Sequence, residues 1–596
     1  MISEIEAVFA SAPKLSPVEQ HKGEILRAIK DRDVVIVVAP TGTGKSTQIP
    51  VMLLEVAELV VVTQPRRIAA ESLARHVAME LKTDVGNIVG FQTAFSGEFS
   101  SSTRILYCTD GIEMLRQLHG ARNPGSTIFV IDEAHEWSLN LEVLVAWFKK
   151  QITDGNPVKL IILSATIEAD LLSAFFSDAE VINCEGKSFP VQEIPHAGNA
   201  ISAAVRLLKR NLNVLVFVPG KQEIRETIAG ITKSGVKAKC LPFHADLNTE
   251  DIQWVFESFD EPKCVVATTI AQTSLTIPDI DAVVDGGLER GSEYKNGVEG
   301  LYTRPVSLAE REQRRGRAGR TKPGYYIDCS KIPLKERSIF SIPSIKRHEL
   351  SGMVLQVLAA GYEPEKLAFF HPPSLQRINE ARQTLMNIGF LDAEQRLTKM
   401  GRQATSIPVQ PRAAKMLLEA VNQNGVVDYN AITLAAVFDS KNLWFRTEEG
   451  RALIAGNYLE LGVSDAFEKI KTFDAASLLP VHKLTEYGIE RSSFERLKEQ
   501  RVLIVERLNR LGYSEGKQNR TLHAKFIVAG LSDLVFTRSA VSGDYTGIHG
   551  STPRKLSRGS TITAEKVVGL PWNFETHTDL GPVVRRMLLW ATAIPN

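Results

Sequence analysis

Five short apolar runs mark the first part of the chain, and stretches with helical periodicity separate them. Each run is apolar at consecutive positions, which is typical of a strand that a parallel sheet buries on both faces. The runs occupy residues 34–38, 59–63, 104–108, 127–132 and 159–164. This pattern predicts an α/β domain with a parallel sheet.

The same alternation then starts again, with apolar runs at 214–218, 263–269 and 281–287. Two α/β domains in tandem are therefore expected, joined near 189–198. From about Ile342 to about Leu511 the apolar positions recur with a period near 3.6, which indicates a helical region. Beyond it, residues 526–536 and the Gly/Ser/Thr-rich stretch to Ile562 favour short strands and turns, and so a small β-domain at the end.

Composition agrees with a chain of several domains, because 596 residues exceed what one core usually holds. Lys and Arg number 70 against 69 Asp and Glu, so the whole chain has no basic excess. Locally the balance differs: residues 304–347 hold 12 basic and 4 acidic residues, and residues 501–596 hold 13 and 7. Such patches suit phosphate binding, or are ordinary surface balanced by acidic neighbours in space.

The five cysteines are scattered and include no Cys-x-x-Cys pair, which fits neither a disulfide framework nor a structural zinc site. A cytoplasmic location is the simplest expectation. The first ten residues carry Glu4 and Glu6 where a signal peptide would be basic, and no apolar run approaches the ~20 residues that span a bilayer. We expect no membrane partner.

A glycine-rich segment follows the first apolar run and opens a predicted helix. Glycines let the backbone wrap a phosphate, Lys45 would place its charge on the β- and γ-phosphates, and the Ser46 hydroxyl would bind Mg²⁺. Ala39 replaces the first glycine of the strict motif and is small enough for the turn. The alternative is a glycine-rich turn with an incidental lysine. The predicted nucleotide-binding residues are Thr41, Gly42, Thr43, Gly44, Lys45, Ser46 and Thr47.

Two carboxylates, Asp132 and Glu133, follow the fourth apolar run at the sheet edge where ligands of such domains bind. Asp132 could hold the Mg²⁺ of a nucleotide, and Glu133 could deprotonate an attacking water. Taken alone, an acidic pair at this place is as often the start of a helix. The phosphate-binding segment makes the catalytic interpretation the stronger one.

With Ala134 and His135, these carboxylates complete the tetrapeptide Asp-Glu-Ala-His, and the chain resembles a DEAH-box RNA helicase of superfamily 2, of the short bacterial type. The remaining motifs of that family are matched in order. The segments of this chain that resemble those motifs are TQPRR at 63–67, TDG at 109–111, SAT at 164–166, VFVPG at 216–220, ATTIAQTSLTI at 267–277 and QRRGRAGR at 313–320.

The resemblance implies two RecA-like domains, at 1–190 and 191–340, in an α/β fold. It further implies a winged-helix-like part at 341–405, a ratchet-like helical bundle at 406–520 and an OB-like β-domain at 521–596. Asn296 and Gly297, flanked by Tyr294 and Tyr302, predict a hairpin, which in that family separates strands; the alternative is a plain surface hairpin.

The resemblance also implies roles for single residues. Arg317 and Arg320 are the candidate arginine fingers, expected to share one face of a helix, and the alternative is a solvated basic helix. Gly316 and Gly319 argue against that alternative because glycines there suggest a close approach to another surface. The implied catalytic residues are Glu133, His135, Gln313, Arg317 and Arg320, and the implied metal ligands are Ser46 and Asp132.

Further positions are expected to couple hydrolysis to strand movement or to contact nucleic acid. The coupling residues are Ser164 and Thr166, and the RNA-binding residues are Arg66, Arg67, Thr109, Ser274 and Thr276. The chain departs from the family at Trp137, Thr269 and Gln272, which bear on that coupling. His76 and Leu288 stand where the family tends to place an Arg and a Phe around the base, so we expect weak stacking and broad nucleotide use.

The function expected from this resemblance is an NTP-dependent RNA helicase that moves 3′ to 5′ on single-stranded RNA and unwinds duplexes, using Mg²⁺ with ATP and with other NTPs as well. Two alternatives stay open: a DNA-directed motor, and a nucleotide-gated RNA-binding or remodelling protein that does not unwind. We expect a monomer. The sequence names no activating protein.

Overall fold

The structure is a computed structural model. It describes residues 16–40, 43–121, 123–164, 169–177, 179–184, 189–196, 198–244, 247, 249–272, 277–320, 322–438, 443–454, 456–547, 552–557, 559–578 and 581–594.

The first domain is an eight-stranded sheet in the order β4-β3-β5-β2-β6-β7-β1-β8, parallel except for the β3–β4 pair. All five strands expected here form within one residue of the predicted bounds. The strands are β1 (Val34–Val38), β2 (Leu59–Gln64), β3 (Val89–Gln92), β4 (Gly97–Glu98), β5 (Ile105–Thr109), β6 (Thr127–Ile131), β7 (Lys159–Ser164) and β8 (Glu180–Asn183).

Helices cover both faces of this sheet because successive side chains of each strand point to opposite sides. Val35 and Val37 pack toward α3 (Lys22–Asp31), α4 (Lys45–Leu53) and α5 (Arg67–Glu80). Val34 and Ile36 pack toward the other layer. That layer comprises α6 (Asp110–Leu118), α7 (Leu139–Thr153) and α8 (Ala169–Phe175), and the short elements α2 (Pro17–Gln20) and η1 (Ala134–Glu136) complete the domain.

The second domain is a six-stranded, wholly parallel sheet in the order β11-β12-β10-β13-β16-β9. Its strands are β9 (Val191–Glu193), β10 (Val214–Phe217), β11 (Lys239–Phe243), β12 (Lys263–Ala267), β13 (Ala282–Asp285) and β16 (Gly324–Asp328). Its helices are α9 (Ala200–Leu208), α10 (Lys221–Lys233), α11 (Thr249–Phe256), η2 (Thr269–Gln272) and α12 (Leu308–Arg315). The segment expected as the connection between the domains therefore supplies β9, an edge strand of the second sheet.

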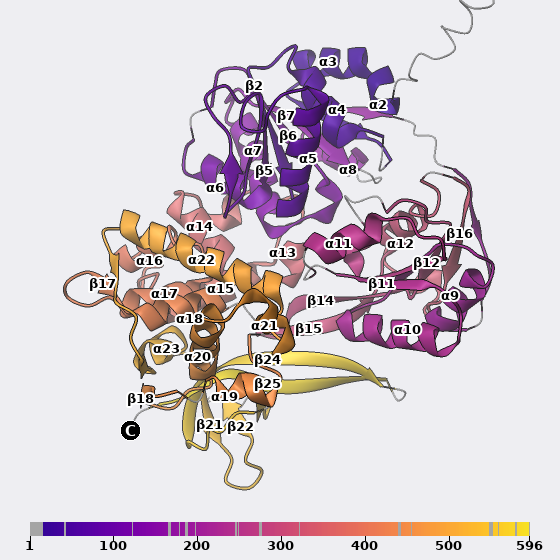
Figure 1. The fold of residues 1–596 in the computed structure, drawn as a ribbon. Coiled ribbons are helices and arrows are strands. Elements are labelled where there is room, and N and C mark those ends of the chain that lie inside the picture. Colours follow the sequence, from indigo (N-terminus) through magenta and orange to yellow (C-terminus); the bar gives the residue numbers. More distant parts are fainter. Residues whose placement is uncertain are drawn as a thin grey trace, which may run out of the picture.

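Beyond the second sheet the chain is mainly helical, as expected, and packs beneath the first domain (Figure 1). The helices are η3 (Leu334–Glu336), α13 (Ser344–Arg347), α14 (Ser351–Ala359), η4 (Pro364–Lys366), α15 (Leu375–Asn387), α16 (Lys399–Ala404), α17 (Pro411–Glu419), α18 (Tyr429–Val437), α19 (Glu448–Ala452), α20 (Ala466–Ser477), α21 (Val481–Glu486) and α22 (Arg491–Arg510). Two small parallel pairs join β17 (Val426–Val427) to β19 (Ser514–Glu515) and β18 (Leu459–Leu461) to β20 (Thr521–His523).

The segment 526–536 was expected to form strands, and the first half of that prediction is wrong. It forms α23 (Lys525–Gly530), whose buried Phe526 and Ile527 pack into the helical core, and only then β21 (Val535–Arg538). Gly530 lies so close to α17 that a Cβ there would sit 2.5 Å from Cγ of Met416. Tertiary packing, rather than the β-propensity of the run, decides its conformation.

A seven-stranded mixed sheet joins the second domain to the end of the chain. It contains β14 (Leu288–Lys295), β15 (Val298–Pro305), β21, β22 (Tyr545–Gly547), β23 (Lys555–Leu556), β24 (Lys566–Thr578) and β25 (Gly581–Ala593). The predicted hairpin is confirmed: β14 and β15 pair antiparallel around Asn296 and Gly297, both at positive φ. β15 also pairs parallel with β24, so segments far apart in sequence share one ladder.

The apolar cores divide the molecule unevenly. One continuous core runs from the α6–α8 face of the first sheet through the helical region, whereas the second sheet has its own two clusters. No helix in the part of the chain that the structure describes is long and apolar enough to cross a bilayer.

Candidate nucleotide and nucleic-acid site

The glycine-rich segment turns sharply into α4. Gly44 has φ 88°, a left-handed conformation that favours glycine, and Lys45, which is buried, is the first residue of the helix. Thr43 Oγ1 donates to the Pro40 carbonyl at 2.8 Å, and the Tyr107 hydroxyl donates to the Ser46 carbonyl at 2.8 Å. The helix N-terminus and the Lys45 ammonium together form an anion-binding position. Thr41 and Gly42 lie outside the described residues.

Asp132 stands at the end of β6, directly beside this helix. Its carboxylate accepts a hydrogen bond of 2.6 Å from Gln64 and another from the Ser46 side chain. Burial and repulsion by Glu133 raise the pKa of Asp132, while Lys45 and the hydrogen bonds oppose that rise. A hydroxyl and a carboxylate in direct contact are the oxygen ligands that Mg²⁺ prefers, so the residues present fit that ion.

Glu133 has φ 50°, in the left-handed region, and its backbone amide donates a hydrogen bond of 2.8 Å to the Asp132 carboxylate. Burial alone would raise the pKa of Glu133, but the neighbouring side chains lower it, Lys45 most of all, with Arg317 and Arg66 contributing. Within the described part of the chain, Glu133 Oε2 and both ring nitrogens of His135 are buried without a hydrogen-bond partner, although Nε2 of His135 lies 3.5 Å from Oε2 of Glu133. A buried acceptor that is held ionised and unpaired suits a general base awaiting a water.

Arg317 and Arg320 of the second domain act electrostatically on Glu133 of the first. The expectation that they share a helix face is wrong. α12 ends at Arg315, with Gly316 as its C-cap, and both arginines lie in the turn that follows. The turn requires a residue without a side chain at position 319, because a Cβ on Gly319 would lie 2.6 Å from the Phe189 carbonyl oxygen.

Burial makes both arginines less stable as cations. Burial lowers the pKa of Arg317 well below its ordinary value, and repulsion by Arg320 adds to the effect. Burial lowers the pKa of Arg320 to about 10. Arg317 Nε also donates to the Gln272 carbonyl at 3.1 Å, and two buried guanidinium groups beside Glu133 form a position that suits the binding of an anion.

A buried ion pair, which the sequence did not predict, supports the arginine turn. Arg314 Nη1 lies 2.7 Å from Asp285 Oδ1, both side chains are inaccessible to solvent, and the Tyr326 hydroxyl donates to Asp285 at 2.9 Å. The Nε of Arg314 also donates to the Gln272 side chain, and Gln272 in turn donates to Gln313 at 2.9 Å. The available sequence signal was an acidic residue inside an apolar strand.

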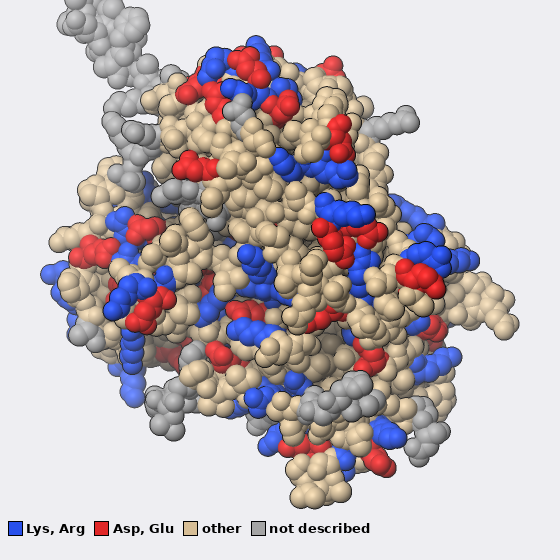
Figure 2. All heavy atoms as spheres, turned by 180° about the vertical axis from the view of Figure 1, so that it is seen from behind, with Lys and Arg blue, Asp and Glu red and all other residues tan. Residues whose placement is uncertain are grey.

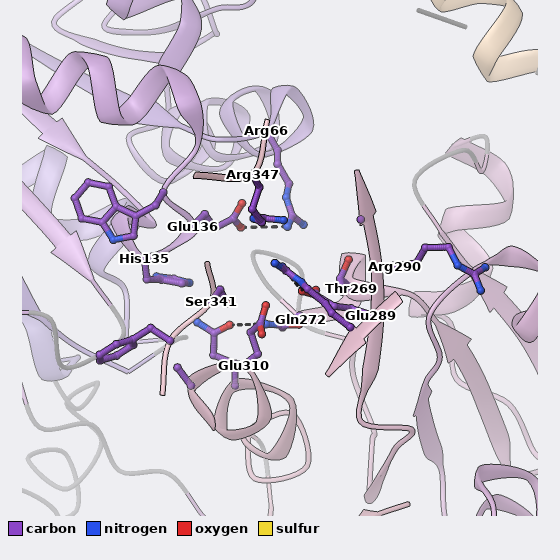
Figure 3. A pocket seen from close by; sticks show the side chains of 16 residues that line it. Arg66, His135, Glu136, Thr269, Gln272, Glu289, Arg290, Glu310, Ser341 and Arg347 are labelled. Atoms are coloured by element: carbon purple, nitrogen blue, oxygen red, sulfur yellow. Dashed lines mark hydrogen bonds and ion pairs between the residues drawn. The ribbon is translucent and has the colours of Figure 1, made fainter. Parts of the chain in front are cut away.

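A cavity of about 260 Å³ opens between the domains next to these residues (Figure 3). Arg66 and Glu136, 3.1 Å apart, reach it from the first domain. The other lining residues come mainly from the second domain and the segment after it: Thr269, Gln272, Glu289, Arg290, Gly291, Arg304, Ala309, Glu310, Gln313, Phe340, Ser341 and Arg347, with His135 and Trp137 completing the wall.

The structure describes three of the predicted RNA-binding residues, Arg66, Arg67 and Thr109. Arg66 pairs with Glu136, and Arg67 lies 3.6 Å from Glu499 and 4.7 Å from the ring of Phe95. Both arginines therefore have a carboxylate partner. Thr109 precedes α6, and Ser164 is buried at the end of β7. Thr166, Ser274 and Thr276 lie outside the described residues.

His76 and Leu288, the residues expected near the base, sit on separate elements. His76 is half exposed on α5 and pairs with Glu80 of the same helix at 3.2 Å. Leu288 begins β14, and its carbonyl accepts a hydrogen bond from Arg314.

The basic segment 304–347 is mostly balanced by carboxylates in space. Figure 2 shows basic and acidic side chains interspersed on one face of the molecule. The pairs are Arg304 with Glu289, Arg311 with Glu193 and Asp328, Arg314 with Asp285, Arg315 with Glu312, Lys322 with Asp281, and Arg337 with Asp328. The second of the two interpretations of this patch therefore holds for these six residues.

Comparison with known proteins agrees with this geometry. The DEAD/DEAH box helicase family matches residues 20–174, and the helicase conserved C-terminal domain matches residues 199–322. Residues 20–174 and 199–322 thus carry the two domains of a DEAD/DEAH-box helicase. The resemblance seen in the sequence is thereby confirmed, and the two matched segments contain the two parallel sheets.

This DEAH-box protein is 34% identical over 451 residues to the ATP-dependent RNA helicase HrpA of Escherichia coli, an alignment that covers 71% of the chain and 35% of the relative. It is 35% identical over 458 residues to the HrpA homolog of Haemophilus influenzae, with the same coverage. The chain thus spans about a third of the length of these curated relatives.

Solved structures of HrpB from Escherichia coli share its fold. One, described as a DEAH/RHA helicase, gives a TM-score of 0.75 at 24% identity and covers 94% of the chain and 68% of HrpB. Another, described as a DExH-box NTPase, gives a TM-score of 0.77 at 24% identity and covers 98% and 69%. Two RecA-like sheets, a helical region and a mixed C-terminal sheet are therefore the architecture of this DEAH-box protein.

Proposed function

We propose that the chain is an NTP-dependent RNA helicase that couples hydrolysis to 3′-to-5′ movement on single-stranded RNA and to duplex unwinding. The observation that carries the proposal is the convergence on Glu133 of Lys45 from its own domain and of Arg317 and Arg320 from the other domain. These cationic side chains are placed where they could bind the negative charge of a triphosphate.

In the proposed reaction, the α4 N-terminus and Lys45 hold the β- and γ-phosphates, and the loop residues Thr41 to Thr47 surround them. Ser46 and Asp132 would hold Mg²⁺, which when bound neutralises phosphate charge. Glu133 orients and deprotonates the attacking water, assisted by His135 and Gln313. Arg317 and Arg320 stabilise the charge of the transition state, and they do so only when the second domain closes on the first.

RNA would lie in a groove between the first domain, the second domain and the helical region. A cavity of about 420 Å³ is lined there by Arg67, Thr93, Phe95, Arg491 and Arg496, and also by Glu71, Glu495 and Glu499, among others. Arginines and one aromatic ring suit phosphates and a stacked base, which hold a strand without reading its sequence. Arg66, Thr109, Ser274 and Thr276 would extend this contact, and Ser164 and Thr166 would couple it to the nucleotide.

The finer domain assignment belongs to the same proposal. Residues 341–405 would be the winged-helix-like part, 406–520 the ratchet-like bundle and 521–596 the OB-like domain, with the hairpin at Asn296 and Gly297 separating strands. The exposed His76 and the aliphatic Leu288 support broad NTP use, since neither offers an extended ring to a base. All five cysteines are free thiols, which supports a cytoplasmic location. We further propose that the protein acts as a monomer.

The decisive experiment measures hydrolysis of ATP, GTP, CTP and UTP alone and with single-stranded RNA, single-stranded DNA or duplexes. Stimulation by RNA, with displacement of a strand from a 3′-tailed RNA duplex, is the expected result. Equal or greater stimulation by DNA would favour a DNA-directed motor. Stimulation without strand displacement would favour a remodelling protein, and hydrolysis of ATP alone would contradict the proposed base tolerance.

A further inference from the structure

Two residues in the left-handed region bound the acidic motif. Glu133 has φ 50° and Trp137 has φ 38°, and the short helix η1 lies between them. Neither residue is a glycine, so this conformation persists only where the surroundings enforce it. The contacts of Trp137 show what holds this residue in the left-handed conformation.

The indole of Trp137 lies buried against two aromatic rings. Its ring centroid is 4.7 Å from that of Phe370, with the planes 17° apart, and 4.8 Å from that of His371, with the planes 84° apart. The backbone is held as well, because the Trp137 carbonyl accepts a hydrogen bond of 3.1 Å from the Ser344 amide. Stacked and edge-on aromatic pairs are directional contacts, so they fix the orientation of the ring.

The partner rings are themselves fixed to the first domain. His371 Nδ1 lies 2.5 Å from Oε1 of Glu142, a fully buried residue of α7, and the Phe370 ring also packs edge-on against Phe175 of α8. Phe370 and His371 follow η4, and Ser344 begins α13. The segment 344–371 therefore crosses from the end of the second domain onto the first and clamps the loop that carries Glu133.

We propose that Trp137 is a positioning residue through which the segment 344–371 sets the orientation of Glu133. This inference rests on the proposed NTP hydrolysis. The five residues from Glu133 to Trp137 leave little freedom, so an unsupported Trp137 would let the loop relax toward ordinary φ values and move the carboxylate away from the attacking water. Lys45 and Ser46 lie on another segment, and nucleotide binding would be unaffected.

The test compares Trp137→Ala, Phe370→Ala and the double variant in steady-state NTP hydrolysis. We expect kcat to fall about tenfold or more in each, with KM changed less than about twofold, because a misplaced general base slows chemistry without weakening substrate binding. The double variant should be no slower than the slower single variant, since both remove the same stack. Trp137→Phe, which keeps a ring, should recover most of the loss.

The matched control is Phe473→Ala, which removes one ring of an aromatic pair, Phe473 and Phe494 at 5.4 Å, inside the helical region. It lowers stability but leaves kcat unchanged. A second measurement needs no hydrolysis: amide hydrogen exchange of peptides covering 132–138 should rise in Trp137→Ala and Phe370→Ala and stay unchanged in the control.

The possible failures are distinguishable. If the wild type hydrolyses NTP and Trp137→Ala keeps its kcat, or if exchange at 132–138 is the same in all variants, the positioning role is overturned while the proposed function stands. If the wild type hydrolyses no NTP, the proposed function fails, and hydrogen exchange still decides whether the stack holds the loop.

Discussion

Arg317, in the turn after α12, faces Glu133, which follows β6, and attraction between them helps to lower the pKa of the carboxyl. These residues belong to different sheets and are brought together only by the packing of the two domains. The candidate catalytic base and the candidate arginine finger thus interact across the boundary between the two domains.

Replacement of Arg317 tests that relationship. We expect Arg317→Ala to lower kcat about a thousandfold, because an arginine finger stabilises transition-state charge to that extent, with a small change in KM. Arg315→Ala is the control: Arg315 is two positions away, partly exposed, and pairs only with Glu312 of its own helix among its described contacts. Phosphate release assays measure both, and equal rates in the two variants would contradict the finger assignment.

Glu133→Gln separates binding from chemistry. The change removes the proton acceptor but preserves shape, so hydrolysis should fall by about a hundredfold or more while a fluorescent ATP analogue still binds. Lys45→Ala should instead weaken binding of the ATP analogue, since it removes the charge that holds the phosphates. If Glu133→Gln hydrolyses at the wild-type rate, another group is the base.

The buried pair of Arg314 and Asp285 is expected to matter for folding. Asp285→Ala leaves a guanidinium uncompensated in the core and should lower the free energy of unfolding by about 3–5 kcal/mol. Arg396→Ala breaks exposed pairs with Asp392 and Glu394 and should cost less than about 1 kcal/mol. Thermal unfolding of the three proteins checks this, and similar Tm values would refute the importance of the pair.

Asp110 predicts a pH dependence of stability. Burial raises its pKa from 3.8 to about 7, although a hydrogen bond from Ser138 opposes the rise. Between these values the folded state keeps a proton that the unfolded chain has released, so the free energy of unfolding falls as pH rises, by up to about 1.4 kcal/mol per pH unit. Asp110→Asn should lack this fall between pH 4 and pH 7. Urea unfolding at several pH values measures it, and parallel profiles would argue against a raised pKa.

Sequence reasoning succeeded where one physical cause dominates. The strands β1, β2, β5, β6 and β7 are buried on both faces, and unbroken apolar runs report that burial directly. The loop at Gly44 and Lys45 was predictable because a left-handed turn before a helix restricts the residue types allowed.

Sequence reasoning failed where contacts between residues that are distant in the sequence determine the local structure. β3, β8 and β9 are short and lie toward the sheet edges, so they carry no long apolar run. Arg317 and Arg320 lie outside the predicted helix because the helix ends at Gly316 and because Gly319 packs against the backbone of Phe189. The stack of Trp137 on Phe370 joins residues 233 positions apart (370 − 137), and no local pattern reveals such a contact.

The ladder between β15 and β24 covers the edge of β15 that does not pair with β14. Glu299, Gly300 and Leu301 use their outer edge to pair with Trp572, Asn573 and Phe574, and a Cβ at Gly300 would sit 2.6 Å from the Asn573 carbonyl oxygen. A fragment that ends at residue 340 would leave those amides and carbonyls unpaired, as a template for strands of other molecules. The C-terminal strands thus act as a built-in cover against aggregation, and expressing the two RecA-like domains alone is expected to give oligomers that the full chain does not form.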